Sequence, residues 1–546
     1  MSQKEEESST TVTLDMIFLK IGQFGKYQKI IYLLICVPMF CNAVFQFGYV
    51  FTTSSPIYRC KTACDIEGFS DYNAPYVNFS IPEDLNGAGR FSKCSRFMEK
   101  ESVENFTCSP DQFDSKVEEC NKHEFIFKDK VTTIANEFKI FCDDEWMLSL
   151  VGTISSLAQF IGYPIAGFMS DKYGRKTMIA LSGTISATMG IIKSFAPNYI
   201  IFLIFEFLDG MAGNTLFNCV FVMAVELAVP QNRVLTCSLL SAIYPFGEIY
   251  LALVASTTDN WRTLLRVAYT PALLLTLYFW VLPESIRWQL SKSKDDDVTR
   301  NLKQAARKNK VHLQERDIFF LLKENSKSIS SSQILSSESE FPIRDAFKAI
   351  PYRIIVCAFC FFTNVFVFNG LNINSVLLGG NKYTNFMLCA LVEVPGVLLP
   401  IFTMDRFGRR FSLSGCMVIS GLCIAATIFI QRENTSAILF FFLTGKLAIS
   451  ASFSVLMFYS SEIFPTTIRQ SLIAISSTAG RIGSLIAPQT TLLAKYFASG
   501  PLILFSAAAL LMAVFSTGLP ETMNTPLPAT LEDAKNIGKK KNNVKA

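Results

Sequence analysis

Gly167-Phe-Met-Ser-Asp171-Lys-Tyr-Gly174-Arg175-Lys176 ends a long apolar run, and a similar stretch, Asp405-Arg-Phe-Gly408-Arg409-Arg410, ends another. The aspartates of the two copies lie 234 positions apart. Each copy places acidic and basic side chains directly after an apolar segment. A repeated motif of this kind indicates that the chain contains two related halves.

Two further motifs repeat at nearly the same offset. Glu226 precedes Arg233 by seven residues, and Glu462 precedes Arg469 by the same spacing, 236 positions later. Pro283-Glu284-Ser285 has a counterpart 237 positions later in Pro520-Glu521-Thr522. Three signatures displaced by almost one distance predict a duplicated half, and duplicated apolar halves are typical of secondary transporters.

The composition excludes several classes of protein. Of the 546 residues, 50% are hydrophobic and 49 are Phe, which is more apolar surface than a soluble core of this size could bury. The formal charge is only +5, with no basic stripe interleaved with aromatics, so no nucleic-acid partner is expected. With two His and no nucleotide-binding loop or nucleophile set, we expect no enzyme, no metal and no cofactor.

Hydropathy predicts an all-α membrane protein with twelve transmembrane helices in two six-helix bundles. A polar tail at 1–28 precedes the first helix at 29–51, and a polar insert at 283–349 separates the remainder of the first bundle, 147–282, from the second, 350–519. The other eleven expected spans are 147–169, 177–195, 199–225, 234–256, 263–282, 350–373, 383–404, 411–430, 436–459, 470–494 and 497–519.

The segment 52–146 has the composition of a water-exposed domain. It holds six cysteines, which predict three disulfides in an oxidising compartment and permit fifteen pairings: Cys60, Cys64, Cys94, Cys108, Cys120 and Cys142. Asn78-Phe-Ser and Asn105-Phe-Thr are glycosylation acceptors. Both signals place this loop outside the cell. Lys and Arg collect in the loops of the opposite face, so the insert, the N-terminal tail and the tail at 520–546 are expected in the cytosol.

The repeated charges at the expected cytosolic helix ends predict a gate. Solvated loop charges would explain one copy of the pattern but not two at matching spacings. We therefore expect ion pairs between the halves that hold one face closed in one state and part in the other. The predicted gating residues are Asp171, Arg175, Glu226, Arg233, Asp405, Arg409, Glu462, Arg469 and Glu284.

Several motifs carry a family resemblance. The loop motif from Gly167 to Lys176 resembles that of the major facilitator superfamily, and Pro283-Glu-Ser-Ile-Arg287-Trp288 is similar to its sugar-porter and organic-ion branches. The cysteine loop, Asn260-Trp261-Arg262 and Glu462-Ile-Phe-Pro465-Thr466 together resemble the organic cation/anion/zwitterion transporters, as does the opening Gly22-Gln-Phe-Gly25-Lys-Tyr-Gln28. The resemblance implies a major facilitator fold and alternating-access transport of small organic ions. The chain departs from the family at Ile401, Ile286 and Glu206.

Charges inside the expected spans are candidates for substrate binding, because a charge at bilayer depth must pair or line a cavity. They are Glu206, Asp209, Glu248, Glu393, Lys446 and Arg481. By resemblance, Arg481 corresponds to the arginine of anion and zwitterion carriers and Glu393 to the acid of cation and zwitterion carriers. The two facing one cavity would suit a zwitterion, and structural ion pairs are the alternative. The resemblance also adds Phe217, Phe368, Tyr244, Phe458 and Asn369, the aromatic members as cation–π partners.

These features predict a plasma-membrane carrier of organic cations or zwitterions. Organic anion transport, sugar transport and a transporter-like sensor remain alternatives. The expected partners are a small organic ion, the lipid bilayer, and a coupling ion or counter-substrate, with the monomer as the working unit.

Overall fold

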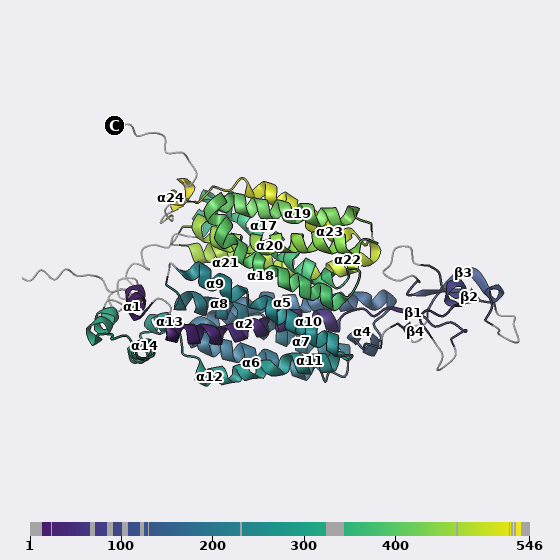
Figure 1. Cartoon of the computed structure of the whole chain (residues 1–546), viewed down its shortest axis with the longest axis horizontal. Coiled ribbons are helices and arrows are strands. Elements are labelled where there is room, and N and C mark those ends of the chain that lie inside the picture. The colour runs from purple at the N-terminus through teal and green to yellow at the C-terminus, as the bar shows by residue number, and fades with distance from the viewer. Residues whose placement is uncertain are drawn as a thin grey trace, which may run out of the picture.

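The apolar runs fold into helices that lie side by side along one long axis (Figure 1). This arrangement comes from a computed structural model of the whole chain. The residues that it describes are 14–22, 25–65, 71–83, 91–100, 108–120, 125–128, 130–229, 232–323, 343–431, 433–465, 468–523, 525, 528 and 531–536.

The helices form two halves. The N-terminal half contains α2 (Lys26–Thr52), α5 (Trp146–Tyr173), α6 (Arg175–Lys193), α7 (Tyr199–Gly213), α8 (Leu216–Leu227), α9 (Arg233–Ser241), α10 (Tyr244–Thr257), α11 (Trp261–Tyr269), η4 (Thr270–Leu277) and α12 (Tyr278–Val281). The C-terminal half contains α17 (Pro351–Ser375), α18 (Lys382–Phe407), α19 (Arg409–Phe429), α20 (Thr435–Ile463), α21 (Arg469–Ile486), η5 (Ala487–Gln489), α22 (Thr490–Tyr496) and α23 (Gly500–Ser516).

Nine helical segments in the described part of the chain are long and apolar enough to cross a membrane. The other three expected spans correspond to α6, to α21 with η5 and α22, and to α23, which has 17 residues. Several expected spans are interrupted, as at Asn214 and Thr215 between α7 and α8. Such breaks are tolerated where neighbouring helices satisfy the freed backbone groups.

The loop between α2 and α5 forms a small domain of two antiparallel strand pairs. β1 (Tyr58–Cys60) pairs with β4 (Phe125–Phe127), and β2 (Ser95–Glu99) pairs with β3 (Phe113–Glu119). The three expected disulfides are present, and of the fifteen pairings the structure has Cys60–Cys120, Cys64–Cys108 and Cys94–Cys142. The disulfides stabilise the fold of this domain, because its hydrophobic core is too small to do so alone.

A buried ion pair also holds this domain together. The Arg59 guanidinium donates to both carboxylate oxygens of Asp65 at 2.8 and 2.7 Å, and the Tyr76 hydroxyl donates to one of them at 2.6 Å. Burial alone would raise the pKa of the Asp65 carboxyl, but these donors hold it below its usual range. Asn78 lies exposed on the short helix α3 (Val77–Ser80), whereas Asn105 lies outside the described residues.

The described parts of the polar insert and of the two tails lie at the opposite end of the molecule (Figure 1). They contribute α1 (Leu14–Ile21), α13 (Ile286–Ser291), α14 (Asp295–Asn309), a helix at 315–323, α16 (Ile343–Ala349) and α24 (Leu531–Asn536). The serine-rich part of the insert lies outside the described residues. We call this end, defined by α1, α13, α14 and α24, the tail end, and the end that carries residues 53–145 the loop end.

Candidate functional site

The motif that repeats in the sequence forms a polar network at the tail end of the N-terminal half. The Arg175 guanidinium contacts Asp171 at 2.8 Å and Glu226 at 3.2 Å. The Glu284 carboxylate accepts from the backbone N–H groups of Arg175 at 2.9 Å and Lys176 at 3.1 Å, which caps the first turn of α6. Burial raises the pKa of the Glu284 carboxyl, although these backbone donors oppose the shift.

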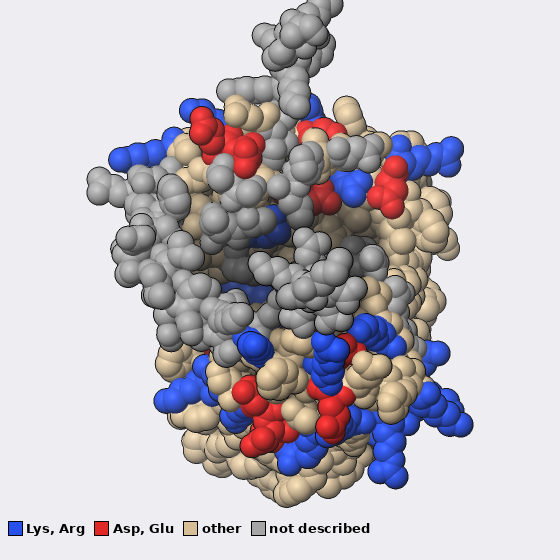
Figure 2. Space-filling view, turned by 90° about the vertical axis from the view of Figure 1, so that its left-hand side faces the viewer, with Lys and Arg blue, Asp and Glu red and all other residues tan. Residues whose placement is uncertain are grey.

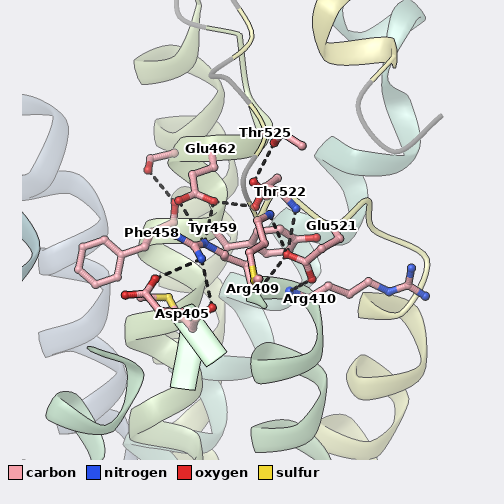
Figure 3. A network of polar contacts seen from close by, with 12 residues as sticks. Asp405, Arg409, Arg410, Phe458, Tyr459, Glu462, Glu521, Thr522 and Thr525 are labelled. Carbon is pink, nitrogen blue, oxygen red and sulfur yellow. Dashed lines mark hydrogen bonds and ion pairs between the residues drawn. The ribbon is translucent and has the colours of Figure 1, made fainter. Parts of the chain in front are cut away.

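The C-terminal half repeats this network (Figure 3). The Arg409 guanidinium lies between Asp405 at 3.3 Å and Glu462 at 3.2 Å, and the Glu521 carboxylate accepts from the backbone N–H of Arg409 at 2.9 Å. The hydroxyl of Thr522 adds a 2.6 Å hydrogen bond to Glu462. The duplicated sequence motif therefore builds the same device twice.

A glycine is required before each capped helix. Gly174 and Gly408 have φ of +104° and +86°, a region that side chains rarely adopt. A Cβ on either glycine would also overlap the carboxylate of Glu284 or Glu521. The repeated Gly-Arg step thus reflects both backbone conformation and the close approach of the capping acid.

In this conformation the described contacts of each network stay within its own half. Arg469 donates to the backbone carbonyl of Phe464 at 3.3 Å, and the side chain of Arg233 lies outside the described residues. Contacts between the halves in another conformation therefore remain a prediction.

A second polar cluster lies where the two halves meet, and we call it the central cluster: Glu248, Asn372, Glu393 and Lys446. The Asn372 amide donates to Glu248 of α10 at 3.1 Å and to Glu393 of α18 at 3.2 Å, so it links the halves. The Lys446 ammonium pairs with Glu393 at 2.8 Å. Glu248 and Lys446 are 0% exposed and Glu393 is 2% exposed.

The central cluster has unused hydrogen-bonding groups. Glu248 Oε2, Asn372 Oδ1 and the Tyr244 hydroxyl are buried without a partner in the described part of the chain. Such groups cost free energy unless something binds them. Two predicted aromatic residues border the cluster. The Phe217 ring packs edge-on against the Tyr244 ring with 6.3 Å between their centroids, and the Lys446 ammonium lies 3.2 Å from the centroid of the Phe368 ring.

Arg481 is not paired with Glu393, whose ion-pair partner in the described part of the chain is Lys446. The Arg481 guanidinium instead stacks on the Tyr163 ring of α5 at 3.8 Å. Within the described ranges no carboxylate lies at ion-pair distance from Arg481. Tyr163 is also a neighbour of Tyr244, which in turn lies close to Glu248 and Glu393. Arg481 therefore lies at the edge of the region that contains the central cluster.

A small, largely polar cavity, with room for about one water molecule, lies between the halves. Asn369, one of the predicted binding residues, lines this cavity and accepts a 3.3 Å hydrogen bond from Gln46. Phe458, another of them, is not among the residues that line it. Phe458 lies twelve residues beyond Lys446 on α20, about 18 Å along the helix, and its ring points away from the Arg409 network (Figure 3). The structure therefore separates Phe458 from the other predicted binding residues.

The two halves meet at the loop end. The Ser149 and Thr491 hydroxyls are 2.9 Å apart, and Gln489 donates to Thr153 at 2.7 Å. Figure 2 shows the tail-end face, which is hollowed between its upper and lower parts. The central cluster thus lies between a closed loop end and a hollowed tail end.

A third cluster lies inside the N-terminal half. The Lys193 ammonium contacts Glu206 at 2.8 Å and Asp209 at 2.6 Å, and the Tyr269 hydroxyl donates to Asp209 at 2.7 Å. The Ser186 hydroxyl also donates to Asp209. Sequence reasoning singled out the two acids but missed Lys193, because it stood near the expected end of a span. Its position thirteen residues before Glu206, across a short turn, was the available signal.

Comparisons with known proteins agree with this architecture. Residues 35–532 match the family described as "Sugar (and other) transporter". The chain is 30% identical to the "Organic cation transporter protein" of Drosophila melanogaster, over 96% of this chain and 95% of that one. It is 28% identical to "Solute carrier family 22 member 3" of Rattus norvegicus, over 96% of each chain.

Solved structures show the same fold. A partially occluded inward-open form of the xylose transporter XylE from E. coli superimposes with a TM-score of 0.60 at 15% identity, covering 91% of this chain and 98% of that one. The predicted major facilitator fold is therefore confirmed, with nine long apolar helices in the described residues where twelve spans were expected.

Proposed function

Because the chain belongs to the sugar (and other) transporter family, and within it resembles the organic-ion carriers throughout its length, we propose that it moves a small organic cation by alternating access. The observation that carries the proposal is the buried, unpartnered Glu248 oxygen between the two halves. The proposal places this carrier in the plasma membrane.

The charges of the central cluster favour a cation. Two carboxylates, Glu248 and Glu393, face one ammonium, Lys446, so one negative charge is left over when all three are ionised. Lys446 satisfies Glu393, which leaves Glu248 to meet an incoming ammonium. Tyr244 lies one turn before Glu248 on α10 and packs edge-on against Phe217; the face of such a ring attracts a desolvated cation by roughly 1–2 kcal/mol.

A zwitterion is the second candidate, and Arg481 favours it. Its guanidinium can bind two carboxylate oxygens at once. In this arrangement the substrate ammonium lies at Glu248 rather than at Glu393, and the substrate carboxylate lies at Arg481. An organic anion or a sugar would leave the surplus acid of the central cluster unmatched.

The proposed topology has the loop end outside the cell and the tail end in the cytosol. The disulfides of the loop domain and the Lys and Arg residues of the tail end support this orientation. The conformation described above is then closed to the outside. Each chain carries a complete site between its own halves, which supports function as a monomer.

Uptake into proteoliposomes tests the proposal. The probes are a tetraalkylammonium, a betaine, an aromatic carboxylate and glucose, offered to the wild type, to Glu248→Gln and to the control Asp259→Asn, which changes an exposed acid. We expect tetraalkylammonium uptake, weakened more than tenfold in apparent affinity by Glu248→Gln and unchanged by Asp259→Asn, because interaction with a desolvated charge contributes about 2–5 kcal/mol. Preference for the carboxylate or for glucose, or binding without time-dependent uptake, would contradict it.

A further inference from the structure

The cluster around Lys193 has more acid than base. Lys193 donates to Glu206, Asp209 and the Tyr269 hydroxyl, so its three protons are all used. Asp209 accepts from Lys193, Tyr269 and Ser186, which satisfies it as an anion. The one ammonium is therefore matched by Asp209, and Glu206 carries the surplus negative charge.

Among the described residues, the groups around Glu206 include no second cation. Lys193 faces it from α6, Asp209 from its own helix α7, Tyr269 from α11 and Tyr49 from α2. From α5 it meets the uncharged Ser155. Lys193 and Glu206 are each 1% exposed and Asp209 is 0% exposed. A carboxylate buried among these groups without its own counter-charge is less stable than the neutral acid.

Tight packing keeps this arrangement in place. The Tyr269 ring lies directly against Gly190, where any Cβ would overlap it. Gly190 is one turn before Lys193 on α6, so the glycine lets the tyrosine reach the acids. The cluster is thus a built site rather than a chance meeting of charges.

Glu206 also has a route to the space between the halves. Ser155 lies beside the Glu206 side chain, and both Ser155 and Tyr49 line the small cavity between the halves. A serine hydroxyl can accept one proton and donate another. The Ser155 hydroxyl therefore gives the Glu206 carboxylate a path for protons to any water that enters the cavity.

We propose that Glu206 is a proton-binding site and that its proton is the coupling ion of transport, an inference that rests on the carrier function proposed above. In protonation a hydronium ion that reaches the cavity gives its proton to the Glu206 carboxylate, which forms an O–H bond and leaves water; in deprotonation the proton returns to water as hydronium. When the halves rearrange between the two steps, the cavity faces the other side and the proton crosses the membrane. No other reactant is needed.

Infrared spectroscopy of the purified protein tests proton binding without transport. At neutral pH we expect the wild type to show a carbonyl band of a neutral carboxyl group that Glu206→Gln lacks and the control Asp259→Asn retains. Glu206→Gln keeps the Lys193–Asp209 pair and the shape of the side chain, so it should fold. Identical carboxyl bands in the wild type and Glu206→Gln would overturn the proposal.

Proteoliposomes with a pH gradient test coupling. We expect the gradient to drive tetraalkylammonium accumulation in the wild type, with substrate-dependent proton flux reported by an internal pH dye. Glu206→Gln should lose both while keeping exchange of labelled for unlabelled substrate. Wild-type uptake that ignores the gradient would overturn the coupling and leave the carrier function intact. If the wild type takes up no probe at all, the carrier function fails, and the infrared bands still decide whether Glu206 holds a proton.

Discussion

The two halves share their tail-end networks but differ in where they bury charge. Arg175 with Glu226 and Arg409 with Glu462 have nearly the same geometry, each with a capping acid from the segment that follows the last helix of its half. The N-terminal half encloses Lys193 with two acids inside its own helices, whereas Lys446 of the C-terminal half lies where the halves meet. The repeat therefore preserves the tail-end networks, while the buried charges of the two halves lie in different places.

Removing the buried ammonium should destabilise the two halves to different extents, and this is the largest effect that we expect. Lys193→Met leaves Asp209 buried without its counter-charge inside one bundle, and we expect a loss of about 3–5 kcal/mol of stability. Lys446→Met should cost less, because the interface between the halves can admit water. Thermal unfolding of the purified variants measures both losses. An equal loss would show that the two sites are structurally equivalent.

Variants of Arg481 test whether the C-terminal half also supplies a positive charge to the substrate site. If the substrate is a zwitterion, Arg481→Lys should weaken its uptake despite keeping the charge, because lysine lacks the two-pronged geometry. Arg481→Asp should shift preference toward simple cations, by more than tenfold for an interaction of about 2–5 kcal/mol. Uptake of betaine and tetraalkylammonium by both variants measures this. An unchanged order of preference would remove Arg481 from the binding site.

The tail-end networks should respond alike in the two halves. Arg175→Ala and Arg409→Ala each leave half-buried acids without their partner, and we expect transport to fall several-fold at normal surface expression. Asp171→Asn should have a smaller effect, since Asp171 is 72% exposed and exposed pairs contribute about 0–1 kcal/mol. Uptake normalised to surface-labelled protein is the measurement. Normal turnover in both arginine variants would exclude a gating role.

The smallest expected effect concerns the helix caps. Glu284→Gln should cost about 1 kcal/mol, with Glu521→Gln as the matched change in the other half. Because burial raises the pKa of the Glu284 carboxyl, the folded protein holds this proton more tightly than the unfolded chain does. The contribution of Glu284 is therefore full below its ordinary pKa of 4.5 and is lost as pH rises through the higher folded value. Melting temperatures across this range should fall for the wild type relative to Glu284→Gln, and a pH-independent difference would contradict the argument.

Local patterns in the sequence were enough for the architecture. The repeated Gly-Arg motif, the apolar runs and the six clustered cysteines each depend on neighbours in the chain, so they predicted two halves, helical spans and a disulfide-bonded loop. The expected span at 470–494 was less accurate, because η5 interrupts the helix between α21 and α22. Helix breaks of this kind depend on packing partners that are distant in sequence.

Pairing between distant helices was decided by the tertiary structure. The sequence by itself determined that Glu393, Lys446 and Arg481 are intramembrane charges, because burying them among apolar residues demands a partner or a cavity. Only the fold decided that Glu393 pairs with Lys446, that Arg481 stacks on Tyr163, and that Lys193 joins Glu206 and Asp209. Periodicity determines which face of a helix a residue occupies, but the neighbour that this face meets depends on how all the helices pack together.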